Sequence, residues 1–108
     1  MKRTKNMVIR ETEESRELYL YANNTASLYS RYIVPVVRNL AKKQGKGIFD
    51  ADKAVDAFYP IACEAARMYC KEFARIEDAP KVFSVSDRFT CAAELLDYYK
   101  ENIEANDI

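Results

Sequence analysis

The side chains that most often carry out catalysis are scarce in this sequence. Histidine is absent, which removes the commonest general base and the commonest zinc ligand. The three cysteines, Cys63, Cys70 and Cys91, have no paired Cys-x-x-Cys spacing, and their odd number does not fit a disulfide framework. We interpret them as small buried hydrophobic residues in a reducing compartment. The sequence therefore predicts a protein that is not an enzyme and uses no cofactor and no metal.

Carboxylates are the remaining side chains that could bind a metal ion. In the last predicted helix they recur in steps of three and four residues, which places them on one helical face. They would bind a divalent cation only if another helix supplied further ligands, so we interpret them as a solvent-exposed acidic face. These residues are Glu94, Asp97, Glu101 and Glu104.

A basic stretch is the main candidate for a binding surface. It has no acidic residue between positions 31 and 47. Steps of seven and four residues place its first three cations on one helical face, and two tyrosines near its start would allow base stacking beside phosphate contacts. The candidate binding residues are Arg31, Arg38, Lys42, Lys43 and Lys46, with Tyr29 and Tyr32.

Three interpretations of this stretch stay open. The lysines of Lys42–Gly47 can stabilise a helix C-terminus, with the glycines forming the turn. The loop also leads to a helix N-terminus, whose free amides could bind an anion or a nucleic acid. Alternatively, the stretch is a charged protein-binding face. The glycines are too close together for a P-loop, which needs four residues between glycines and then Lys-Ser/Thr.

Helical periodicity of apolar residues dominates the chain from residue 12 to residue 104. We expect the first segment, which ends at Gly45–Gly47, to be one long helix kinked at Pro35, although Asn23-Asn24-Thr25 could divide it in two. The second helix begins after Asp50 and is expected to kink or split at Pro60. Ser84 and Asp87 resemble a capping box for the last helix. The sequence thus predicts an all-α fold, a small antiparallel bundle of three to four helices.

Length and composition fit one domain. The chain has 108 residues, 49% of them hydrophobic, and only 2 glycines and 3 prolines, which argues against a turn-rich β-sandwich. We expect a flexible basic arm over residues 1–11, a helical domain over 12–104 and a frayed tail over 105–108. The 17 basic and 17 acidic residues cancel, and neither a signal peptide nor a membrane-length apolar run is evident. We therefore expect a cytoplasmic protein with no membrane contact.

The eight tyrosines have two interpretations. Tyr19 and Tyr21 cannot share a helical face, and neither can Tyr98 and Tyr99, so we expect one of each pair to be exposed or half-exposed. Exposed tyrosines are typical of interfaces, whereas amphipathic tyrosines also fill the rim of a core. Surplus aromatics would also allow a homodimer.

Several segments together resemble a family of small helical proteins of phages and mobile elements that is tied to no activity. They are Glu17–Ala22, Asn39–Lys43, Gly45–Asp50, Lys53-Ala54, Ala65–Phe73 and Asp87-Arg88. The resemblance implies a helical fold and a mobile-element origin in a bacterial host, and it transfers no functional residue. We expect a non-enzymatic accessory protein that acts by protein–protein interaction, including inhibition of a host factor. The alternative is a nucleic-acid-binding accessory protein that uses the basic stretch.

Overall fold

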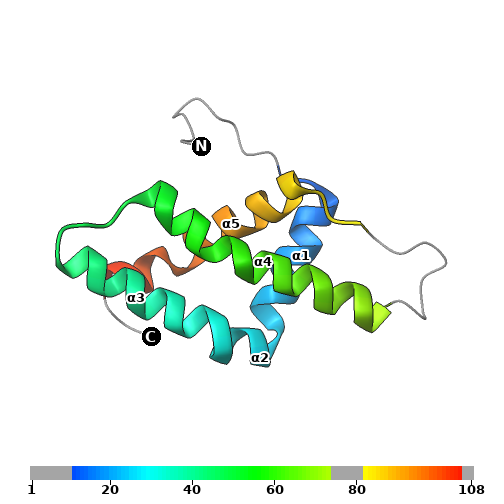
Figure 1. The fold of residues 1–108 in the computed structure, drawn as a ribbon, viewed down its shortest axis with the longest axis horizontal. Helices are drawn as coiled ribbons and strands as arrows, with labels where there is room; N and C mark the ends of the chain where they lie inside the picture. The colour runs from blue at the N-terminus through cyan, green and yellow to red at the C-terminus, as the bar shows by residue number, and fades with distance from the viewer. Residues whose placement is uncertain (1–10, 74–81, 106–108) are drawn as a thin grey trace.

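The computed structural model describes residues 11–73 and 82–105, and all regular structure in this part of the chain is helical (Figure 1). The predicted all-α bundle is confirmed. Its elements are α1 (Glu13–Asn24), α2 (Ala26–Leu28), a π-helical turn η1 (Tyr29–Ile33), α3 (Val34–Gly45), α4 (Ala51–Phe73) and α5 (Val85–Ala105). The expectations for residues 1–10 and 106–108 lie outside the described residues.

The prediction of one continuous first helix is wrong, because the chain breaks at Thr25. Its backbone is extended, with φ −95° and ψ 109°. The Thr25 hydroxyl donates a hydrogen bond of 2.5 Å to the carbonyl of Tyr21, which caps the end of α1. A new helix begins at Ala26. This local hydrogen bond competes with continuation of the helix, as threonine side chains commonly do.

Pro35 is accommodated by a change of helix type. The amide of Val34 donates to the carbonyl of Tyr29, five residues back, which is the π-helical pattern. Pro35 then lies in the first turn of α3, where its missing N–H group costs little. The segments α2, η1 and α3 therefore follow one another as a single rod. In contrast, α4 continues through Pro60 and is not split there.

The rod ends at the predicted glycines in a Schellman motif. Ile48 donates its amide to the carbonyl of Lys43 at 2.9 Å, and Gly47 donates to Gln44 at 3.1 Å. Gly47 has a φ of +73°, a conformation that a residue with a Cβ rarely adopts. The glycines of the basic stretch thus have a structural role in ending a helix.

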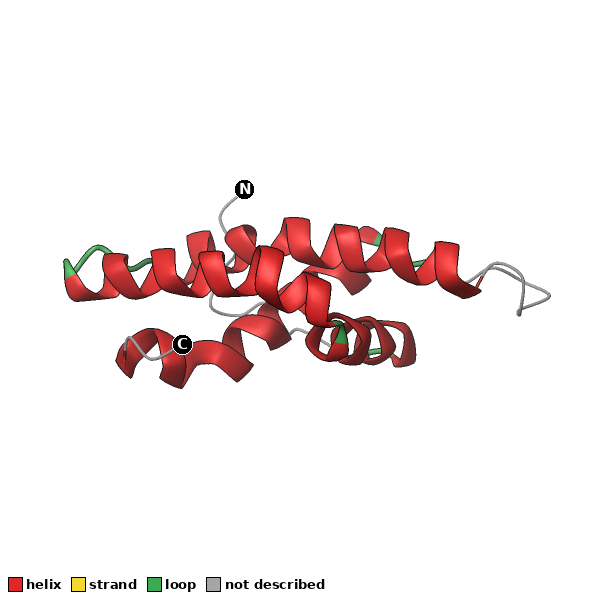
Figure 2. Cartoon of the chain, turned by 90° about the horizontal axis from the view of Figure 1, so that it is seen from below, coloured by secondary structure: helices red, strands yellow, loops and turns green. Residues whose placement is uncertain are grey.

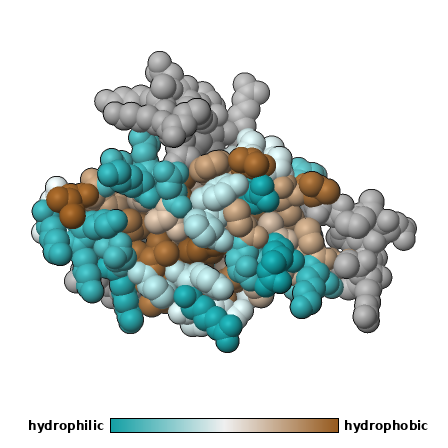
Figure 3. Space-filling view, viewed as in Figure 1, coloured by the Kyte–Doolittle hydropathy of each residue, from teal (hydrophilic) through white to brown (hydrophobic). Residues whose placement is uncertain are grey.

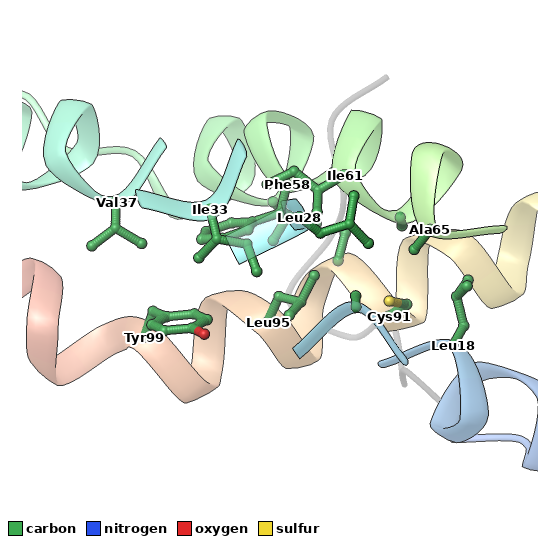
Figure 4. Close-up of a cluster of buried hydrophobic side chains, with 14 of the residues drawn as sticks. Leu18, Leu28, Ile33, Val37, Phe58, Ile61, Ala65, Cys91, Leu95 and Tyr99 are labelled. Atoms are coloured by element: carbon green, nitrogen blue, oxygen red, sulfur yellow. The ribbon is translucent and has the colours of Figure 1, made fainter. Parts of the chain in front are cut away.

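The helices form two layers around one core (Figure 2). Helices α3, α4 and α5 alternate in direction, whereas α1 lies across them (Figure 1). Helix α5 packs against α1, α3 and α4. Side chains from both layers meet between them (Figure 4), and the largest fully buried ones include Phe58, Leu18, Leu28, Ile33, Ile61, Leu95, Ile103 and Val37.

The N-termini of α1 and α5 are joined by their caps. Thr12 and Ser15 form a capping box at α1, and the predicted capping box of Ser84 and Asp87 at α5 is confirmed. The Thr12 hydroxyl also donates a hydrogen bond of 2.9 Å to Asp87 Oδ1. Burial raises the pKa of Asp87, but the hydrogen bonds from Thr12 and Ser84 outweigh burial and hold that pKa below its ordinary value.

Three tyrosine hydroxyls hold α1 in place. Tyr99 of α5 donates to Asn23 Oδ1 at 2.6 Å. Two further hydrogen bonds join α1 to α4. Tyr69 of α4 donates to Glu17 of α1 at 2.7 Å, and Tyr21 of α1 donates to Glu72 of α4 at 2.6 Å. These tyrosines are amphipathic residues of the core rim, with an apolar ring packed inside and a hydroxyl that bonds another helix.

We expect opposite effects from alanine at the two glycines. Gly47→Ala should lower the free energy of unfolding by about 1–2 kcal/mol, because its left-handed backbone is unfavourable for alanine. Gly45→Ala should raise it by about 0.5–1 kcal/mol, because Gly45 lies in α3 and the space that an alanine methyl group would enter is open. Urea denaturation measures both, and equal effects at the two sites would contradict the Schellman assignment.

Because Asp87 bonds both caps, we expect the free energy of unfolding to fall at acidic pH. Asp87→Ala should cost about 1–2 kcal/mol at pH 7, as loss of a cap does. Because the folded pKa of Asp87 is lowered, its contribution is present above the unfolded pKa of about 3.9 and is lost as the pH falls through the folded value. Thermal unfolding between pH 2 and 7 should show wild type and variant converging at low pH; a constant difference would contradict this.

Candidate functional site

The predicted basic residues lie on the outer side of the rod, and all five are exposed. Arg38, Lys42 and Lys46 follow at four-residue intervals, and the amide of Lys46 still donates to the carbonyl of Lys42, so the three form one row along α3. The opposite side of α3 is buried through Val37, Leu40 and Ala41. We call the exposed cations the basic ridge, comprising Arg31, Arg38, Lys42, Lys43 and Lys46.

The charge of the basic ridge is not neutralised within the described part of the chain. The ion pairs found there join Arg16 to Glu11 and Arg67 to Glu64, and neither includes a ridge residue. The surface over the C-terminal half of α3 is accordingly hydrophilic (Figure 3). Isolated lysines and arginines on such a surface are available to an anionic partner.

The two predicted tyrosines do not form one aromatic platform. Tyr29 is 38% exposed, and its ring centroid lies 6.4 Å from that of Tyr99 of α5. Tyr32 is 41% exposed, and no ring contact joins it to Tyr29 among the described residues. Tyr29 therefore contacts α5, and the two tyrosines form no paired stacking surface beside the ridge.

The helix N-terminus that follows the basic stretch is occupied by a side chain of this protein. Asp50 Oδ1 accepts hydrogen bonds from the amide of Asp52 at 2.9 Å and from that of Lys53 at 3.4 Å. A carboxylate already satisfies these amides and complements the helix dipole. An external anion would meet the negative charge of Asp50, which argues against the anion-binding interpretation of this terminus.

A groove between α4 and α5 was not predicted. It has a volume of about 260 Å³. Its apolar floor comes from three segments, and polar side chains form its rim. The floor residues are Phe49, Ala51, Val55, Ala93, Leu96 and Ile103, and the rim residues are Gln44, Asp97, Lys100 and Glu104. We call this surface the α4–α5 groove. No sequence signal identifies it, since each floor residue resembles an ordinary core residue.

A shallower polar cleft adjoins the groove at Ala93 and Asp97 and extends between α5 and α1. Glu94 lies in it beside Glu11. Burial raises the pKa of Glu94 to about 7, the nearby carboxyl group of Glu11 contributes to this rise, and Arg16 acts in the opposite direction. The protonated form of Glu94 is therefore favoured below neutral pH.

The three cysteines form no disulfide with one another. Cys91 is buried, whereas Cys63 and Cys70 are half-buried, and burial raises the pKa of Cys91 to about 12, which makes it unreactive. Among residues 11–73 and 82–105, no group of three or more histidine, cysteine or acidic side chains could hold a metal ion. No helix of this described part is long and apolar enough to cross a membrane.

The Glu94 carboxyl should make stability fall with rising pH. Its folded pKa is raised to about 7, so its favourable contribution is present below the unfolded pKa of about 4.3 and is lost as the pH rises through 7. Glu94→Gln should remove this dependence and stabilise the protein at pH 8, measured by urea denaturation at pH 5, 6.5 and 8. Parallel pH profiles for wild type and variant would contradict the raised pKa of Glu94.

Comparison with known proteins adds no relative: no family model, curated protein or solved structure matches the chain. The resemblance to proteins of phages and mobile elements therefore stays a prediction.

Proposed function

We propose that this chain is a non-enzymatic binding protein whose basic ridge docks on an acidic surface of a protein partner. The sequence resemblance supports an accessory protein of a phage or mobile element, including one that inhibits a host factor. This role would place it in the cytoplasm of the bacterial host.

The single observation that supports this proposal is the unneutralised row of cations on a rigid rod. Arg38, Lys42 and Lys46 follow one side of α3, all are exposed, and none forms an ion pair within the described residues. A helix holds such side chains at fixed spacing, so an acidic partner can be recognised in one register.

A nucleic-acid-binding role is the second candidate. The row of Arg38, Lys42 and Lys46 advances about 6 Å from one cation to the next, a spacing set by four residues of α-helix. Lysines and arginines so arranged can follow a phosphate backbone without reading its sequence. The separation of Tyr29 from Tyr32 disfavours the base stacking that single-strand binders use, and this difference ranks the protein partner first.

The first test compares two variants with equal change of charge. Lys42→Glu/Lys46→Glu reverses two ridge charges, whereas Lys53→Glu/Lys71→Glu reverses two exposed lysines of α4. Each protein is used to capture partners from bacterial lysate and is titrated by polarisation against single- and double-stranded nucleic acid at about 50 and 200 mM salt. We expect a protein that wild type and control retain and the ridge variant loses.

The outcomes separate the two candidates. Nucleic-acid binding that weakens steeply with salt and is lost only in the ridge variant would replace the protein partner with the second candidate. Equal capture by ridge and control variants, with no nucleic-acid binding at low salt, would show that the ridge serves only helix capping and surface charge.

A further inference from the structure

We propose that the α4–α5 groove is a second docking site, which binds a basic amphipathic helix of a protein partner. One apolar side chain of that helix enters the groove, and its basic side chains lie along the acidic rim. The inference goes beyond the proposed function, because the groove shares no residue with the basic ridge. Gln44 of the groove follows buried Leu40 by four residues, so it lies on the core side of α3, away from the ridge.

The dimensions of the groove favour an anchoring side chain over a metabolite. Small-molecule sites usually have volumes of about 300–1,000 Å³ and enclose most of their ligand. This groove has about 260 Å³, and most of its lining residues belong to α5. Its floor contains Phe49 and Leu96, which are half-buried and so remain partly open to a partner. A leucine or phenylalanine of a partner helix would complete the apolar contact that these residues lack.

The charge around the groove favours a basic partner. Asp97 and Glu104 lie on the rim, and Glu101 lies between them on the same face of α5, at steps of four and three residues. All three are exposed, and none forms an ion pair within the described part of the chain. Lys100 is the one cation among the rim residues that the structure describes. The row therefore presents net negative charge beside an apolar cavity.

The form of this surface favours a helix over an extended segment. From Asp97 to Glu104 the acidic row spans about 10 Å, two turns of α-helix. A helix packed alongside α5 can match this row with lysines or arginines at the same spacing while one apolar residue faces the groove. An extended segment gains affinity by pairing its backbone with a sheet edge, whereas the described part of this chain is helical.

The test uses a fluorescein-labelled amphipathic helix of leucine and lysine, about four turns long, as probe, followed by polarisation near physiological salt. Asp97→Lys/Glu104→Lys should weaken binding at least tenfold. Glu13→Lys/Asp56→Lys, an equal change of charge at exposed sites outside the groove, should change it less than twofold. Ala93→Phe, which fills the groove without changing charge, should also weaken binding at least tenfold. Circular dichroism confirms that each variant is folded.

Four results would overturn the proposal. Equal weakening by both charge reversals would mean unspecific attraction, and full binding by Ala93→Phe would exclude the groove. A wild-type dimer in sedimentation velocity that Ala93→Phe dissociates would assign the groove to a second copy. The sequence of residues 1–10 is also basic; tighter probe binding after Lys2→Glu/Arg3→Glu/Lys5→Glu would assign the groove to the chain's own N-terminal segment.

Discussion

Burial of one face of α5 is the interaction on which the rest of the structure depends. Cys91, Leu95 and Tyr99 lie along this face, where α5 meets α1, α3 and α4. Loss of large buried side chains costs about 2–5 kcal/mol in other proteins, a large share of the stability of a small domain. Because α5 supplies the shared surface, the outer sides of α3 and α5 are not needed for folding and are free to differ in charge.

The zero net charge of the chain hides a separation of positive and negative side chains on its surface. Cations gather on the outer side of α3, and carboxylates gather on the outer side of α5. Under the two proposals, an acidic partner would bind one surface and a basic partner the other. The sum of charges alone would have suggested no electrostatic preference.

The tyrosines show how structural and binding roles divide within one residue type. Tyr21, Tyr69 and Tyr99 use their hydroxyls to join helices, and burial is the first cause that raises the pKa of Tyr21 and Tyr99 to about 12. As predicted, Tyr98 is exposed beside buried Tyr99. Tyr19 and Tyr21 are both half-buried, and Leu20 between them is exposed, because α1 packs against both α4 and α5.

Periodicity and caps in the sequence determined the helical class, the start of α1 after Thr12, the turn at Gly47 and the capping box at Ser84, because these depend on interactions within a few residues. The sequence placed Arg31, Arg38 and Lys42 on one helical face but left open whether the five cations form one exposed surface. The break at Thr25 was one of two alternatives that the sequence left open. Tertiary structure alone decided the π-helical turn before Pro35, the burial of Glu94 beside Glu11 and the α4–α5 groove. Each of the last two joins residues far apart in the chain, and packing sets their separation.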